Sequence, residues 1–133
     1  MTLFSNLDAH AAKVLSGLRI VAGLMFMQHG AQKIFGFPVP AMGPFDIASQ
    51  MGIGGVLELV GGALIVLGLF TRPVAFLLSG MMAVAYFQFH LVPGGVFPLV
   101  NGGELAALYC WVFLYLAFAG PGAWAVDNVL KRP

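Results

Sequence analysis

The sequence predicts an all-α integral membrane protein, built as an up-down bundle of four helices in a single domain over residues 1–133. Of the 133 residues, 60% are hydrophobic and 8% are charged, and the mean hydropathy is +0.95. Soluble domains carry about 25% charged residues, so this chain has too few polar groups to cover a surface in water. The apolar runs are also continuous rather than alternating, which favours transmembrane helices over barrel strands.

The first predicted span covers about residues 14–37. It contains Arg19, lacks a convincing Ala-x-Ala cleavage site and stays apolar too long for a signal peptide. A loop rich in turn residues over 38–44 separates it from the second predicted span, about residues 47–70. We expect Asp46 to be the N-cap of this second helix, because a short polar side chain there can accept from free backbone N–H groups.

The third predicted span covers about residues 73–92, and Pro73 suits its first turn because proline lacks an N–H donor. The fourth covers about residues 104–119. The short link at Thr71 and Arg72 makes the second and third spans antiparallel neighbours.

Basic residues predict how these spans are oriented. Four spans place both termini and the link at Arg72 on one side, and that side also carries Lys13, Lys131 and Arg132, whereas Lys33 is alone on the other. By the positive-inside rule we expect a multi-pass inner-membrane protein with both termini in the cytoplasm. Arg19 and Arg72 are expected to anchor the chain to phosphates of the inner leaflet.

Polar side chains from all four spans reach a similar depth. They are His29, Lys33, Glu58, Gln88, His90 and Glu104. At ~1.5 Å per residue all six lie ~18–28 Å from the predicted cytoplasmic boundary. The sequence therefore predicts a polar pocket in the outer half of the bundle.

A stripe of small residues predicts that Glu58 faces the interior of the bundle. The stripe consists of Gly54, Glu58, Gly61, Ile65 and Gly68 and is flanked by Gly55 and Gly62. Small residues on a transmembrane helix mark a close helix contact. An intramembrane carboxylate is costly and defaults to a functional hypothesis. Structural interpretations stay open: Glu58 can form a buried ion pair, and Lys33 can extend to the outer interface.

Composition excludes several other kinds of site. A net charge of +1 is too small to indicate a basic surface that binds nucleic acid. The single cysteine, Cys110, rules out an intrachain disulfide, and no glycine-rich phosphate loop is present. His and Glu residues lack the close spacing of a metal site, so we expect no metal and no covalently bound cofactor.

The chain also carries a set of family motifs. Residues 18–20 read LRI, residues 29–36 read HGAQKIFG, and residues 58–62 read ELVGG. Residues 67–72 read LGLFTR, and residues 120–127 read GPGAWAVD. Together they resemble the DoxX family of small bacterial and archaeal membrane proteins, over nearly the whole chain. The family's motif residues that match here are Arg19, His29, Lys33, Glu58, Arg72, His90, Glu104 and Asp127.

The resemblance implies a redox function, since the family is similar to the DoxD-type subunit of a thiosulfate:quinone oxidoreductase. Our leading hypothesis is an inner-membrane subunit of a redox complex, catalytic or not, with quinone as its ligand and redox proteins and the lipid bilayer as its partners. Glu58 would exchange protons, His29 and Lys33 would bind the headgroup, and Glu104 and His90 would line the pocket.

Two alternatives stay open. One is a structural or assembly protein, in which the polar cluster fixes the register of the helices and function lies in docking a partner. The other is a small transporter, which the lack of polar residues in the inner half disfavours. The glycine stripe also permits an oligomer.

Overall fold

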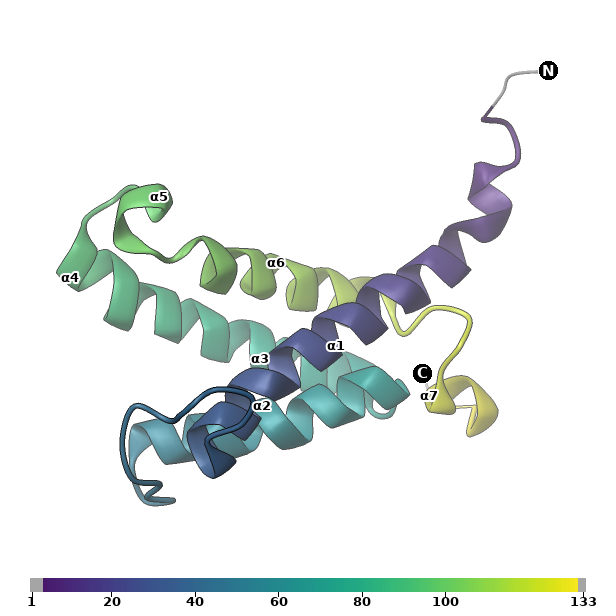
Figure 1. Cartoon of the computed structure of the whole chain (residues 1–133). Coiled ribbons are helices and arrows are strands. Elements are labelled where there is room, and N and C mark those ends of the chain that lie inside the picture. The colour runs from purple at the N-terminus through teal and green to yellow at the C-terminus, as the bar shows by residue number, and fades with distance from the viewer. Residues whose placement is uncertain (1–3, 132–133) are drawn as a thin grey trace.

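The computed structural model describes residues 4–131, and this part of the chain is helical, without strands (Figure 1). Three helical segments are long and apolar enough to cross a membrane, namely Leu7–Phe35, Gln50–Leu67 and Thr71–Gly94, and Glu104–Ala119 is a shorter apolar helix. The all-α prediction is confirmed, and the helices are compatible with a membrane bundle. The up-down order of four spans stays a prediction.

The first segment starts earlier than expected. A 3-10 turn, η1 (Leu7–His10), leads into α1 (Ala11–Phe35). The helix ends at Gly36, whose φ of 64° lies in the left-handed region that favours glycine.

The second helix, α2 (Gln50–Leu67), is capped by Ser49 and not by Asp46. Ser49 Oγ accepts a hydrogen bond of 2.9 Å from Gly52 N. Asp46 Oδ1 accepts instead from Ala48 N in the preceding turn. The predicted cap is therefore wrong, because the Asp46 carboxylate is already used in a local turn before the helix starts.

The third segment is one continuous helix with a change of geometry. It consists of α3 (Thr71–Ala85), the π-helix η2 (Tyr86–Leu91) and α4 (Val92–Gly94). Pro73 lies in the first turn, as predicted, but Thr71 and Arg72 are already helical and the link to α2 is residues 68–70. A π-helix winds more than 3.6 residues into each turn, so α-helical counting misplaces the side chains of η2.

Two short helices flank the last long one. A single turn, α5 (Pro98–Asn101), precedes α6 (Glu104–Ala119), and α7 (Val126–Val129) lies near the C-terminus. The bounds of α6 are those of the fourth predicted span.

The long helices form two pairs. α1 packs along α2 and α3 packs along α6, while the pairs meet mainly through α2 and α3. In Figure 1 the pairs approach each other beside the C-terminal segment and diverge toward the end that carries α4 and α5. The helix pairs are therefore farthest apart at the end remote from the termini.

Glycines bring α1 and α2 into backbone contact. A Cβ placed on Gly30 would lie 2.5 Å from both Gly55 O and Leu59 N, and one on Gly23 would lie 3.0 Å from Gly62 O. The contact therefore runs through Gly55 and Gly62 rather than through Gly54, which has nothing within 4 Å. Glu58, Gly61 and Ile65 of the predicted stripe are buried, and Gly61 packs against Leu78 of α3, so the stripe faces the interior while the flanking glycines contact α1.

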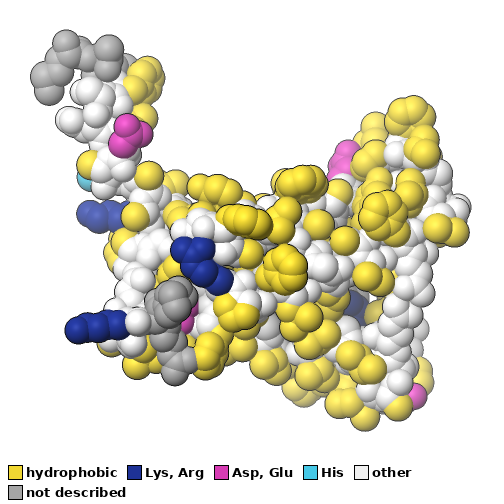
Figure 2. Space-filling view, turned by 180° about the vertical axis from the view of Figure 1, so that it is seen from behind, with side chains coloured by type: hydrophobic (Ala, Val, Ile, Leu, Met, Phe, Trp, Pro, Cys, Tyr) yellow, Lys and Arg dark blue, Asp and Glu magenta, His cyan; other side chains and the backbone are white. Residues whose placement is uncertain are grey.

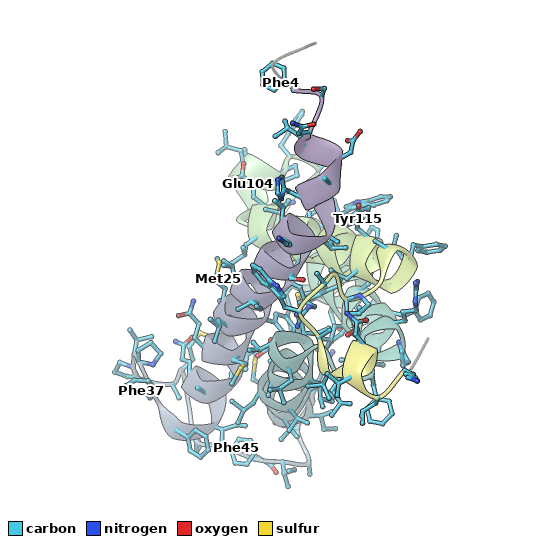
Figure 3. All side chains as sticks on the ribbon, turned by 90° about the vertical axis from the view of Figure 1, so that its right-hand side faces the viewer. Phe4, Met25, Phe37, Phe45, Glu104 and Tyr115 are labelled. Carbon is cyan, nitrogen blue, oxygen red and sulfur yellow. The ribbon has the colours of Figure 1, made fainter. Side chains whose placement is uncertain are left out.

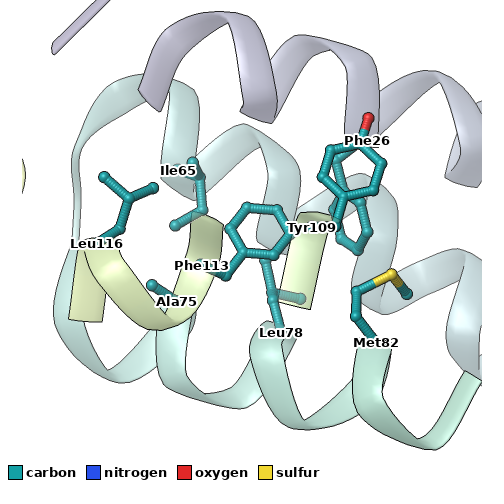
Figure 4. Packing of buried hydrophobic residues seen from close by; sticks show 8 residues of the cluster. All are labelled: Phe26, Ile65, Ala75, Leu78, Met82, Tyr109, Phe113 and Leu116. Atoms are coloured by element: carbon teal, nitrogen blue, oxygen red, sulfur yellow. The ribbon is translucent and has the colours of Figure 1, made fainter. Parts of the chain in front are cut away.

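The hydrophobic core fills the middle of the molecule (Figure 4). Its buried members are Phe26, Ile65, Ala75, Leu78, Met82, Tyr109, Phe113 and Leu116. The rings of Phe26 and Phe113 meet edge to face with centroids 4.9 Å apart, a favourable arrangement for aromatic pairs.

The outer surface of the bundle is largely apolar. Met25 and Tyr115 are 41% and 57% exposed and point away from the core (Figure 3), as lipid-facing side chains do. Figure 2 shows basic side chains gathered at the end where the termini lie. The predicted asymmetry included Arg132, which lies outside the described residues.

Candidate functional site

A cavity of about 460 Å³ lies where the two helix pairs diverge. Its lining comes from α1, α2, α3, η2 and α6. Phe26, Met82 and Tyr109 belong both to the lining and to the buried core, so the core forms the floor of the cavity. The volume falls in the range of small-molecule sites.

The rim of the cavity is apolar and open. Met42, Met51, Phe89 and Leu105 line it and are 87%, 43%, 48% and 40% exposed. A bound ligand can therefore extend a hydrocarbon substituent through the opening of the cavity, where the substituent contacts the apolar side chains of the rim.

Lys33 and Glu58 form an ion pair on one wall. Lys33 Nζ lies 2.5 Å from Glu58 Oε1, and the two side chains are 24% and 6% exposed. The close approach of the helices brings these groups together, since a Cβ on Gly55 would lie only 3.1 Å from Lys33 Cβ. A carboxylate within a membrane helix requires such a partner.

Two buried polar atoms in this cavity have no hydrogen-bond partner among the described residues. They are Glu58 Oε2 and the hydroxyl of Tyr109. Buried polar groups in folded proteins are almost always hydrogen-bonded, so each exception requires an explanation. Both exceptions here belong to residues that line the same cavity.

Aromatic contacts hold Tyr109 in place. Its ring stacks on Phe113 at 5.6 Å and meets the edge of Phe26 at 5.2 Å. His29, also in the lining, makes a T-shaped contact with Tyr109 at 6.3 Å. The phenol ring is therefore held by aromatic contacts, while its buried hydroxyl has no hydrogen-bond partner among the described residues.

His90 lines the cavity from the π-helix. Its Nδ1 lies 3.1 Å from Asn101 O, and because a carbonyl only accepts, Nδ1 is the donor. This hydrogen bond fixes the orientation of the imidazole beside the cavity. Tyr86, one turn earlier, stacks on the same imidazole at 6.4 Å.

Two of the predicted pocket residues lie elsewhere. Gln88 is exposed and pairs with Gln50 of α2, with Nε2 of Gln50 donating to Oε1 of Gln88 at 2.8 Å. Glu104 is exposed in the first turn of α6, where a carboxylate interacts favourably with the helix dipole. Neither residue is therefore part of the cavity lining, because each side chain lies on an exposed side of its helix.

The predicted anchor role required the Arg19 side chain to reach lipid phosphates, but the structure places this side chain inside the protein. The side chain is fully buried. Its guanidinium donates to the carbonyls of Ile65 and Val66 at the end of α2, and to those of Pro121 and Trp124 in the C-terminal segment. The residue thus joins three parts of the chain, and it satisfies carbonyls that a helix end leaves free.

Arg72 and Asp127 also act on helix ends. Arg72 is exposed, and its Nη1 donates to Ala117 O at 3.0 Å and Phe118 O at 2.6 Å at the end of α6. The Asp127 carboxylate accepts from Phe70 N and Thr71 N at 2.8 Å each. It therefore caps the start of α3 from a distant segment.

Comparison with known proteins places these residues in a family. The sequence profile named DoxX matches residues 14–91. The chain belongs to the DoxX family. The matched region includes Arg19, His29, Lys33, Glu58 and His90, so most of the cavity's polar residues lie within the part that defines the family.

Several relatives of this DoxX chain cover most of its length. An uncharacterized protein of Haemophilus influenzae is 45% identical over 128 residues, which is 93% of this chain and 96% of the relative. The inner membrane proteins YqjF and YphA of Escherichia coli are each 30% identical, covering 86% and 83% of this chain and 89% and 85% of their own lengths. No solved structure matches the chain.

The sequence analysis did not include Tyr109 among the pocket residues, although it lines the cavity of this DoxX protein. Tyr109, Phe113 and Leu116 are all buried and recur at the i, i+4 and i+7 spacing of a single helix face. That spacing was the available signal. Among the described residues no group of three or more His, Cys, Asp or Glu is placed to hold a metal ion.

Proposed function

We propose that this DoxX-family chain binds a quinone ring in the cavity and acts as a membrane subunit of a redox complex. The observation that supports this proposal most strongly is the pair of unpartnered buried atoms, Glu58 Oε2 and the Tyr109 hydroxyl, in a cavity that is otherwise mostly apolar. An apolar cavity with a few polar groups is typical of small-molecule sites.

The polar groups of the cavity suit a quinone headgroup. A quinone carbonyl is a hydrogen-bond acceptor, and Lys33, Tyr109 and His29 each offer a donor at the lining. Ring edges can pack on Phe26 and Met82 at the floor. The exposed apolar rim suits an isoprenoid tail that continues into the bilayer.

Glu58 is the residue best placed to exchange protons with the ring. When bound, a quinone supplies paired electron and proton transfer, and its oxygens must gain or lose protons at the cavity wall. Glu58 has one oxygen held by Lys33 and the other unpartnered within the described residues. Redox partner subunits would exchange the electrons.

We further propose that the chain lies in the inner membrane with both termini in the cytoplasm. Two relatives carry names that describe them as inner membrane proteins. Basic side chains gather at the end of the molecule that holds the termini (Figure 2), which by the positive-inside rule supports cytoplasmic termini. The cavity then lies toward the periplasmic side of the membrane.

The experiment is a binding titration of the purified protein in lipid nanodiscs. The probes are ubiquinone-1 and menadione, with isothermal calorimetry as the readout. We expect saturable binding that Tyr109→Phe and His29→Ala each weaken by about tenfold, since a lost hydrogen bond of ~1.4 kcal/mol corresponds to that factor.

Matched controls separate the cavity from the rest of the chain. Tyr115→Phe removes an exposed hydroxyl from the same helix, and His10→Ala removes an exposed imidazole from η1. Both should leave the affinity unchanged. Absence of saturable binding, or equal losses in the cavity variants and their controls, would overturn the proposal.

A further inference from the structure

We propose that the cavity selects the hydroxyl-bearing, reduced form of the ring, a hydroquinone, over the carbonyl-bearing quinone. This inference rests on the proposed function, because it assumes that a quinone-type ring occupies the cavity. It adds the redox state that the site recognises. Its basis is the set of unpartnered buried atoms on residues that line the cavity, and whether each of these atoms accepts or donates a hydrogen bond.

Glu58 presents an acceptor that needs a donor. Its Oε1 is paired with Lys33 Nζ at 2.5 Å in an ion pair. Oε2 is buried and has no hydrogen-bond partner among the described residues. An ionised carboxylate only accepts, so a ligand satisfies Oε2 only by donating a hydrogen.

A hydroquinone supplies that donor and a quinone does not. Both ring oxygens of a quinone are acceptors, and a carbonyl oxygen placed against Oε2 would add repulsion and leave the carboxylate unpaired. A ring hydroxyl placed there forms a charge-assisted O–H···O⁻ bond, which is stronger than a bond between neutral groups. A site with a buried polar group discriminates strongly against an analogue that lacks the matching group.

Tyr109 complements this arrangement. Its hydroxyl is the second unpartnered buried atom in the lining, and a phenol both donates and accepts. It can donate to the oxygen of a hydroquinone as well as to that of a quinone. Tyr109 therefore contributes affinity for both forms, whereas Glu58 contributes the choice between them.

The test compares three ligands on the unmodified protein in nanodiscs under oxygen-free conditions. They are tetramethylhydroquinone, its oxidised form tetramethylbenzoquinone, and the dimethyl ether of the hydroquinone, which keeps the ring but has no donor. We expect the hydroquinone to bind at least about tenfold more tightly than either of the others. This comparison requires no variant, so it does not depend on any substituted chain folding.

Substitutions then assign the preference to Glu58. Glu58→Gln replaces a carboxylate oxygen by an amide that also donates, so it should reduce the preference for the hydroquinone to about threefold or less. Tyr109→Phe should weaken both redox forms alike. Glu104→Gln, an exposed carboxylate outside the cavity, should change nothing.

The outcomes separate the two proposals. If the quinone binds as tightly as the hydroquinone, or more tightly, the proposed selectivity is wrong, whereas the proposed binding of the ring is supported. If the dimethyl ether equals the hydroquinone, recognition is by the apolar ring alone and the selectivity is again wrong. If none of the three ligands, ubiquinone-1 or menadione saturates the protein, both proposals fail.

Discussion

Lys33 Nζ lies 2.5 Å from Glu58 Oε1 and thereby joins α1 to α2 beside the cavity between the helix pairs. Lys33 also lines two smaller hollows, one of about 240 Å³ toward the loop after α1 and one of about 80 Å³ between α2 and α3. Glu58 is shared with the second of these. The ion pair is therefore both a helix contact and part of the cavity wall.

Breaking this pair separates its structural role from its role in binding. Lys33→Met leaves a buried carboxylate uncompensated and should lower the free energy of unfolding by about 2–4 kcal/mol. The double variant Lys33→Met/Glu58→Leu should recover most of that loss, because it removes both charges together. Thermal unfolding in detergent measures both effects.

The same double variant should not recover ligand binding. The hypothesis that the polar cluster only fixes helix register predicts the opposite, a stable and fully functional apolar replacement. Retention of hydroquinone affinity in the double variant would therefore contradict the functional interpretation of the pair.

The contact between α1 and α2 depends on glycine at position 30. In Gly30→Ala the new methyl group would meet Gly55 O and Leu59 N at 2.5 Å, so the helices must separate. We expect a loss of about 1–3 kcal/mol. Gly17→Ala lies on the same helix with nothing within 4 Å and should be neutral or stabilising by up to about 1 kcal/mol. Equal unfolding temperatures for the two variants would contradict the packing.

The buried guanidinium of Arg19 should be more important for stability than for lipid contact. Arg19→Lys keeps the charge but loses the fork of donors to carbonyls of α2 and the C-terminal segment. We expect a loss of about 2–4 kcal/mol in the free energy of unfolding, with the exposed Lys13→Gln as control. A stable Arg19→Lys variant whose unfolding depends instead on anionic lipid would restore the anchor role.

The Asp127 cap is a further test of the C-terminal contacts. Asp127→Asn keeps the shape of the side chain but has one acceptor oxygen for the two N–H groups of Phe70 and Thr71. The expected loss is about 1–2 kcal/mol. Asp8→Asn changes an exposed acid in η1 and serves as the matched control. Indistinguishable unfolding curves would show that the cap is not required.

Sequence alone predicted much of this structure, for identifiable reasons. Long apolar runs define the helices, and α6 has the predicted bounds because Gly103 and Gly120 flank it. Counting residues along each helix also placed His29, Lys33, Glu58 and His90 at the height of one cavity.

What failed was the direction in which side chains point. Glu104 lies on an exposed side of α6, and Gln88 follows the start of a π-helix, where the α-helical period no longer applies. Arg19 was assigned to lipid because its partners are backbone carbonyls from distant segments. Every residue has a backbone carbonyl, so the sequence does not show which carbonyls Arg19 contacts. Only the three-dimensional structure identifies them.

The proposed function requires a quinone-type ring in the cavity above the core. Photo-crosslinking in native membranes with an azido-substituted ubiquinone, followed by peptide mapping, shows whether a ring binds there. We predict labelling within residues 82–90 or 102–109, abolished by excess ubiquinone-1. Labelling confined to the end that holds the termini, or labelling that excess ubiquinone-1 does not reduce, would contradict the claim.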